Sequence, residues 1–73
     1  MADIEARTEV TGSVWKIVTE VGQRVEPGDT IMLIESMKME IPVMTEHAGT
    51  VARFLVAEKA PVTEGQVVAL LEG

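Results

Sequence analysis

The sequence predicts an all-β domain made of two pseudo-symmetric halves. Three observations lead to this prediction. The chain repeats itself once, its apolar residues gather in runs of strand length, and glycine or proline interrupts the stretches between these runs. A chain of 73 residues has the size of one small domain, and we expect residues 1–73 to form a single unit.

The repeat aligns residues 12–35 with residues 49–72 without a gap, at a constant offset (49 − 12 = 37). The first half reads GSVWKIVTEVGQRVEPGDTIMLIE and the second reads GTVARFLVAEKAPVTEGQVVALLE. Both internal glycines, Gly28 and Gly65, stay in register. Since two units are too few for an open solenoid, we interpret the duplication as a closed, pseudo-symmetric domain.

Each half contains two predicted strands joined by a turn. The first strands are SVWKIV (13–18) and TVARFLV (50–56), which are rich in β-branched and large apolar residues. The second strands are IMLIE (31–35) and VVALLE (67–72), two short apolar runs.

Glycines mark the points where these strands begin and turn. Pro27 and Gly28 form a type II turn signal, because proline presets φ at the second position and glycine permits positive φ at the third. Gly65 keeps this glycine in the second half. Gly12 and Gly49 open the first strands, where we expect a bend or a close backbone approach that leaves no room for a Cβ.

The segment ESMKME, residues 35–40, joins the two halves between two strand-like runs. Pro42 argues against a helix around Lys38, so we expect a β-hairpin with Lys38 at its tip. A two-residue hairpin loop favours Asn-Gly or Asp-Gly, and this loop has neither. Either the loop is wider, or Met37 and Lys38 adopt a backbone geometry that costs about 1–3 kcal/mol per residue.

Composition excludes several classes of function. A net charge of −6 disfavours nucleic-acid backbones and anionic membrane surfaces. The longest apolar run, Val67–Leu71, is far shorter than the roughly 18 residues of a spanning helix. The first residues lack the basic and apolar regions of a signal peptide, and the absence of cysteine favours a cytoplasmic setting.

The remaining candidate residues suggest neither a metal site nor a catalytic centre. His47 is the one histidine of a chain without cysteine, so we place it in a loop and expect no metal ligation. Ser36 has no neighbouring histidine base and is not expected to act as a nucleophile. We expect Met32 and Met44 to pack in the core, and Trp15 to pack in the core or at a sheet edge.

The motif Glu35-Ser36-Met37-Lys38-Met39-Glu40 resembles the biotin-attachment motif of biotinyl domains, written Ala/Ser-Met-Lys-Met. With its duplicated halves around a central lysine, essentially the whole chain is similar to the biotinyl/lipoyl attachment domain family. The resemblance implies a flattened β-barrel or sandwich of two four-stranded antiparallel sheets, the barrel-sandwich hybrid. The ungapped halves leave no room for the thumb hairpin of some bacterial carrier proteins. Ser36 replaces the commoner alanine, and Lys59 stands where a glycine matching Gly22 is frequent.

The resemblance also implies a function. Lys38 would receive biotin in amide linkage from a biotin protein ligase, and the arm would carry a carboxyl group from a biotin carboxylase to a carboxyltransferase of the acyl-CoA carboxylase type. The domain would be a non-catalytic carrier, monomeric in isolation. Met37 and Met39 would flank the attachment point, and the ligase would also read Glu35, Ser36 and Glu40.

The chemistry of an exposed lysine agrees with this reading. Lys38 is an ammonium ion at neutral pH, and the sequence supplies neither an apolar pocket nor a second cation to activate it. An external enzyme must therefore position the amine and remove its proton. Met37 and Met39 offer soft contacts that can adapt to more than one active site.

Alternatives remain open. A lipoyl-carrying domain is less expected, because lipoyl domains typically have Asp-Lys-Ala or Asp-Lys-Val at the attachment point. An unmodified interaction module could use the methionine-rich tip to bind a partner directly. The simplest reading of Lys38 is an ordinary solvated turn lysine.

Overall fold

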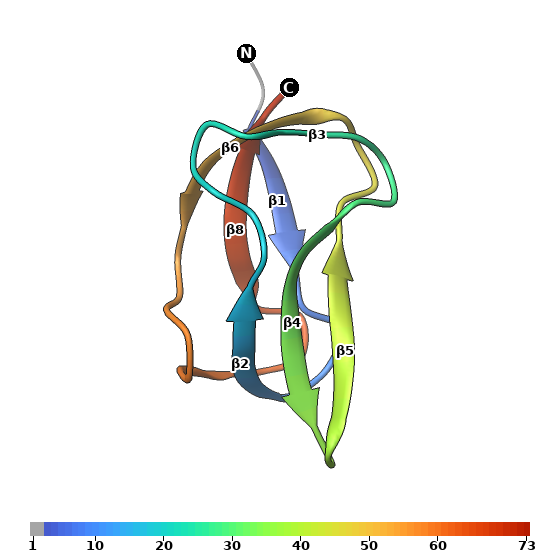
Figure 1. Cartoon of the computed structure of the whole chain (residues 1–73), viewed down its shortest axis with the longest axis vertical. Helices are drawn as coiled ribbons and strands as arrows, with labels where there is room; N and C mark the ends of the chain where they lie inside the picture. The colour runs from blue at the N-terminus through green and yellow to red at the C-terminus, as the bar shows by residue number, and fades with distance from the viewer. Residues whose placement is uncertain (1–2) are drawn as a thin grey trace.

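The computed structural model describes residues 3–73, which form eight β-strands and no helix. The strands are β1 (Asp3–Arg7), β2 (Gly12–Ile17), β3 (Arg24–Val25), β4 (Thr30–Ser36), β5 (Met39–Met44), β6 (Gly49–Phe54), β7 (Pro61–Val62) and β8 (Val67–Glu72). They build two antiparallel four-stranded sheets, β1-β8-β6-β3 and β5-β4-β2-β7 (Figure 1). The predicted all-β fold is confirmed, and because the two sheets have separate hydrogen-bond ladders, the domain is a sandwich and not a closed barrel.

The duplication is visible in the backbone hydrogen bonds. Gly28 N donates to Thr45 O at 2.8 Å, and the equivalent Gly65 N donates to Thr8 O at 2.8 Å. Each strand has a counterpart in the other half of the chain: β1 corresponds to β5, β2 to β6, β3 to β7 and β4 to β8. Replacing every strand in the order β1-β8-β6-β3 by its counterpart gives β5-β4-β2-β7, which is the order of the second sheet. Each half contributes two strands to each sheet, so neither half can bury its apolar residues without the other. The halves therefore fold as one unit.

The core lies between the two sheets and is almost entirely aliphatic. Thr8 and Thr45 are buried beside it, and each hydroxyl bonds the backbone two residues further on. Met32 is fully buried, as predicted, but the prediction for Met44 is wrong, because its side chain is 51% exposed. Strand alternation explains the difference, since Val43 faces the core and its neighbour must face outward. The core consists of Ala6, Val14, Val25, Ile31, Met32, Ile34, Val43, Val51, Val62, Val68, Ala69 and Leu71.

Trp15 is not in the core, so the first of its two predicted positions is wrong. It is 52% exposed on β2, and β7 pairs only with Gly12 and Ser13 of that strand and does not reach Trp15. The pairing register shifts between Val14 and Lys16, so two residues of β2 face Leu33 of β4. Such a bulge redirects a side chain, and here it leaves the indole on the outer face of the sheet.

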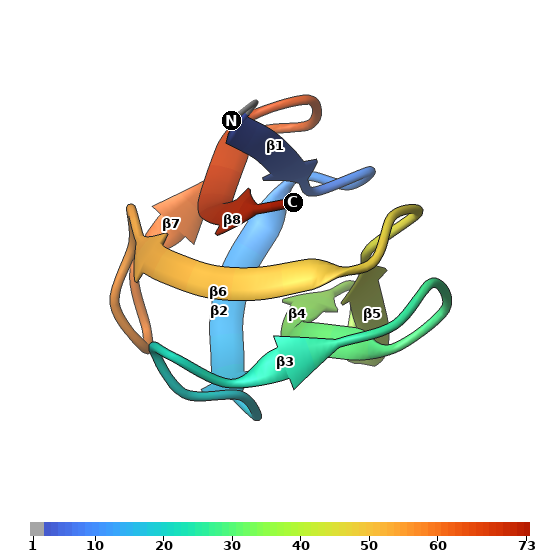
Figure 2. The same cartoon turned by 90° about the horizontal axis from the view of Figure 1, so that it is seen from above.

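The domain is elongated, with extents of 35 × 17 × 16 Å. The β4–β5 turn forms one end of the long axis, and the start of β1 and the C-terminus lie at the other (Figure 1). Figure 2 looks down on the terminal end, where β1 lies beside β8. The hairpin tip thus projects away from the body. No helix within residues 3–73 has the length and apolarity needed to cross a membrane.

The turns confirm the positive φ expected at glycine and show the same conformation at a lysine. Gly28 has φ of 91°, and Asp29 N donates to Glu26 O at 3.0 Å across its turn. Lys59 has φ of 75°, whereas Gly22, at the equivalent position, has φ of 92°. The second half therefore keeps the turn geometry without the glycine that favours it.

Lys59→Gly is expected to stabilise the domain by about 0.5–1 kcal/mol. The left-handed region costs a residue with a Cβ roughly 1–2 kcal/mol, and the added flexibility of glycine in the unfolded chain offsets part of this gain. The backbone bond from Lys59 N to Val14 O, 2.7 Å long, is available to either residue. Thermal melts will measure the change, with Gly22→Lys as the reciprocal variant that should lose stability. A lower melting temperature for Lys59→Gly would contradict the strain argument.

Candidate attachment site

The tip of the β4–β5 hairpin is a two-residue turn. The ladder between the strands ends at the pair Ser36 and Met39, which leaves only Met37 and Lys38 outside it. Their φ angles are 52° and 65°, the positive values that a type I′ turn requires at both central positions. Of the two expected geometries, the wider loop is wrong and the strained turn is confirmed. The strain of the two residues is about 1–3 kcal/mol each.

The base of the hairpin holds this turn in place. The hydroxyl of Ser36 donates to Thr11 O at 2.9 Å, which ties the end of β4 to the segment before β2. Beside it, Glu35 O lies so close to Gly12 that a Cβ there would be 2.1 Å from the oxygen. The predicted close approach at Gly12 is thereby confirmed, as is the one at Gly49. Sequence reasoning missed the bond of Ser36, because nothing local pairs residues so far apart in the chain.

The side chains at the tip are open to solvent. Met37 is 92% exposed, Met39 is 61% exposed, and Lys38 is also exposed. The ion pairs of residues 3–73 join Arg7 to Glu5 and Arg24 to Glu26, and neither involves the Lys38 ammonium. The Lys38 amine is therefore accessible to a macromolecule that approaches along the long axis.

A pair of carboxylates lies directly behind the tip. Glu35 of β4 and Glu40 of β5 are opposite each other in the ladder, and both are exposed. Like charges at directly opposed positions destabilise a sheet. No ion pair within the described residues neutralises them. This end of the protein therefore presents uncompensated negative charge next to one lysine.

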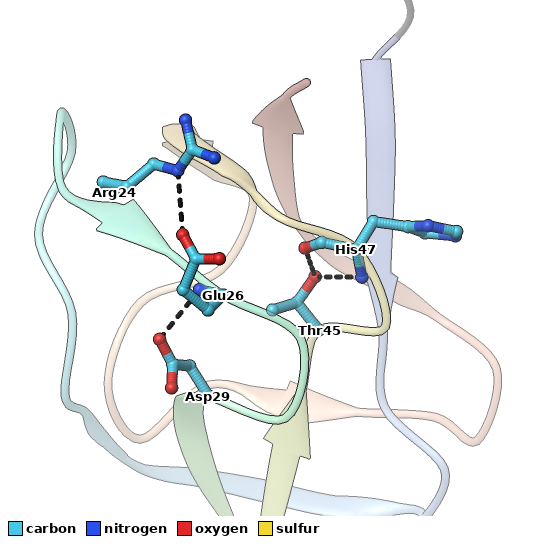
Figure 3. Close-up of polar contacts among 5 residues, drawn as sticks. All are labelled: Arg24, Glu26, Asp29, Thr45 and His47. Atoms are coloured by element: carbon cyan, nitrogen blue, oxygen red, sulfur yellow. Dashed lines mark hydrogen bonds and ion pairs between the residues drawn. The ribbon is translucent and has the colours of Figure 1, made fainter.

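The other candidate residues lie elsewhere. His47 is in the exposed loop after β5, where its backbone N–H donates to Thr45 Oγ1 at 3.1 Å. Figure 3 shows its imidazole pointing away from the carboxylates of Glu26 and Asp29. Across residues 3–73, no three His, Cys, Asp or Glu side chains are grouped to hold a metal ion. A groove runs along the seam between the edge strands β1 and β5, and none of residues 35–40 lines it.

Similar proteins share both the sequence and the fold. The family model described as "Biotin-requiring enzyme" matches residues 5–71. The "Biotinylated protein TB7.3 homolog" of Mycobacterium leprae is 36% identical over 67 residues, which span 92% of this chain and 94% of that protein. The "Biotin/lipoyl attachment protein" of Bacillus subtilis is 36% identical over 59 residues, 81% of each chain.

A solved structure agrees with these relatives. The crystal structure of the Kluyveromyces lactis urea carboxylase matches 97% of this chain with a TM-score of 0.92 at 35% sequence identity. The matched part is 6% of that carboxylase chain, so the likeness concerns one domain of a much larger protein. The chain described here therefore belongs to the biotin/lipoyl attachment domain family, whose model covers nearly all of its length.

Proposed function

We propose that Lys38 carries biotin in an amide linkage and that the domain acts as the carboxyl carrier of a biotin-dependent carboxylase. The geometry of the tip is the observation that supports this most strongly. One exposed lysine stands at the apex of a rigid two-residue turn, between two exposed methionines. The names of the relatives, biotinylated proteins and a biotin/lipoyl attachment protein, point to the same chemistry.

In this role the chain supplies position and the partners supply catalysis. The ammonium of Lys38 must lose a proton before its nitrogen can attack an activated carboxyl group, and a biotin protein ligase would provide the base and the ATP-dependent activation. A tip that is already ordered loses little conformational entropy when it enters that active site. When bound, biotin supplies a group that accepts a carboxyl from a biotin carboxylase and releases it at a carboxyltransferase.

The same rigidity serves the carrier after attachment. The ladder pair Ser36–Met39 and the bond from Ser36 to Thr11 hold the strained turn in place, so the attachment point stays at the end of the hairpin. The flexible part is then confined to the lysine side chain and the group it carries. Tethering of this kind raises the effective concentration of the arm at each active site without any new contact.

A lipoyl carrier is the second candidate, because one relative is named as a biotin/lipoyl attachment protein. The flanking residues favour biotin, since Met37 and Met39 match the Met-Lys-Met pattern of biotinyl domains.

Intact mass after incubation with purified ligases tests the proposal. With a biotin protein ligase, biotin and ATP, we expect the whole protein to gain the mass of one biotin less one water. With a lipoate ligase, lipoate and ATP, we expect little or no change. Lipoylation alone would make the domain a lipoyl carrier, and no gain with either ligase would support an unmodified interaction module.

A further inference from the structure

The duplication allows the outer faces of the two sheets to be compared position by position. Equivalent residues occupy the same place in the fold, so a side chain that one half lacks is not required for folding. The sheet that carries the hairpin pairs β2, β4 and β5, and its counterparts in the other sheet are β6, β8 and β1. Differences between these faces therefore reveal surface features that serve something other than the fold.

The outer face of the hairpin sheet carries a row of apolar side chains. Leu33 of β4 lies opposite Lys16 of β2 on one side and opposite Pro42 of β5 on the other. Trp15 is beside Lys16 at the bulge, and Met44 is two residues beyond Pro42 on the same face of β5. Trp15 and Met44 are 52% and 51% exposed. We call Trp15, Leu33, Pro42 and Met44 the apolar row.

The equivalent face of the other sheet is mostly small or charged. Ala52 replaces Trp15, Glu5 replaces Pro42 and Arg7 replaces Met44 at the same offset. Leu33 alone keeps an apolar counterpart, Leu70. The Arg7 guanidinium pairs with the Glu5 carboxylate at 2.6 Å, a salt bridge on a solvated surface. The fold thus tolerates polar residues where the hairpin sheet exposes apolar ones.

The apolar row lies next to the tip because β4 and β5 are the strands of the hairpin. Pro42 is four residues from Lys38, roughly 13 Å along the strand at about 3.3 Å per residue. The uncompensated carboxylates of Glu35 and Glu40 lie between the row and the tip. An enzyme that takes Lys38 into its active site would meet first the acidic pair and then the apolar row.

We propose that the outer face of β2, β4 and β5 is the docking surface for the biotin protein ligase, which meets the apolar row with apolar side chains and the acidic pair with basic ones. This inference rests on the proposed attachment at Lys38. A specific interface buries about 800 Å² on each partner, more than the three side chains of residues 37–39 can supply. Exposed aromatic residues are the commonest source of the missing binding energy.

The ligase is the fitting occupant because it acts before the arm exists. It must recognise the unmodified domain through protein surface alone, whereas later partners can also bind the attached group. Uncompensated acidic residues beside the row provide the charge complementarity for a basic partner and speed its approach.

The test exchanges the faces, using only residues that the other half already has at the same positions. Trp15→Ala with Met44→Arg converts the apolar row to the character of the opposite face. The reciprocal control, Ala52→Trp, adds apolar surface to the sheet that does not carry the hairpin, at a position outside the groove that Arg7 shares with Pro42 and Met44. Val21→Ala removes an exposed apolar side chain, 63% exposed, from a loop outside both faces.

Initial rates of biotinylation should separate these variants. We expect Trp15→Ala with Met44→Arg to raise the KM of the domain for the ligase at least tenfold with kcat nearly unchanged, because the loss is in binding. The two controls should stay within twofold of wild type, and thermal melts will confirm that all are folded. If Trp15→Ala alone does fold but the double variant does not, the single variant is used in its place.

Two outcomes overturn the docking surface and can be told apart. In the first outcome, the row variant is folded and has an unchanged KM, and the wild-type protein is fully biotinylated. The docking-surface proposal is then wrong, and attachment at Lys38 still holds. If the wild-type domain gains no biotin, both the proposed function and the docking surface fail.

Discussion

Lys38→Arg is expected to abolish biotin attachment while leaving the fold unchanged. Arginine keeps the charge and approximate length of the side chain, and the exposed tip makes no ion pair that the change could break within residues 3–73. Its effect on the free energy of unfolding should stay within about 0.5 kcal/mol. The guanidinium remains protonated near neutral pH and cannot act as the acyl acceptor. Streptavidin capture after incubation with biotin, ATP and a biotin ligase will measure attachment.

The other two lysines provide the controls. Lys59 lies in the turn before β7, outside the docking surface, so Lys59→Arg should be captured like wild type. Lys16→Arg keeps its positive charge on the outer face of β2 and retains Lys38, so it should still reach full capture at the end of the incubation. Met39→Ala keeps the acceptor amine and removes one flanking contact, so its labelling should slow without stopping. Capture of Lys38→Arg, or loss of its thermal transition, would show that attachment at Lys38 is the wrong assignment.

The parts of the fold that the sequence predicts correctly depend on residues whose local preferences determine the backbone conformation or the side of a strand that is buried. The long strands β2, β4, β6 and β8 were expected because their apolar and β-branched residues favour a pleated, buried surface. Gly28 is held at positive φ as expected. Position alone predicted the hairpin tip, since residues 35–40 join the two halves.

The strand β1 was missed because its sequence, DIEAR, is mostly charged. Its strand conformation depends on pairing with β8, which no local preference reveals. The internal repeat contained evidence for β1, because it continues upstream of residue 12. The same offset relates Ile4 to Ile41, Thr8 to Thr45 and Glu9 to Glu46, so the duplication extends upstream through β1 and β5.

At the site, the sequence located the tip but not its turn type. Neither Met37 nor Lys38 prefers positive φ, and only the ladder that closes at Ser36 and Met39 imposes it. The error at Met44 has a different origin. Residue type suggested burial, whereas strand phase, readable from Ile41 and Val43, required the side chain to face outward.

Gly12→Ala is expected to be the most destabilising single substitution proposed for this domain. The added Cβ would be 2.1 Å from Glu35 O and 3.2 Å from the Ile34 side chain, so β4 must move away from β2. Forcing two hydrogen-bonded strands apart in this way should cost about 3 kcal/mol. For a domain of this size that corresponds to a fall in melting temperature of roughly 12–24 °C.

Alanine variants at three glycines test this explanation, because their melting temperatures should fall in a definite order. A Cβ at Gly49 would be 2.7 Å from Glu72 O, a milder collision, so Gly49→Ala should lose less stability than Gly12→Ala. A Cβ at Gly22 would meet nothing within 4 Å, and its alanine variant should lose only the roughly 1–2 kcal/mol of a left-handed residue. Since Glu35 begins the segment that carries Lys38, the folded fraction of Gly12→Ala should also be biotinylated more slowly than Gly22→Ala. A melting temperature for Gly12→Ala at or above that of Gly22→Ala would rule out the close approach as the reason for this glycine.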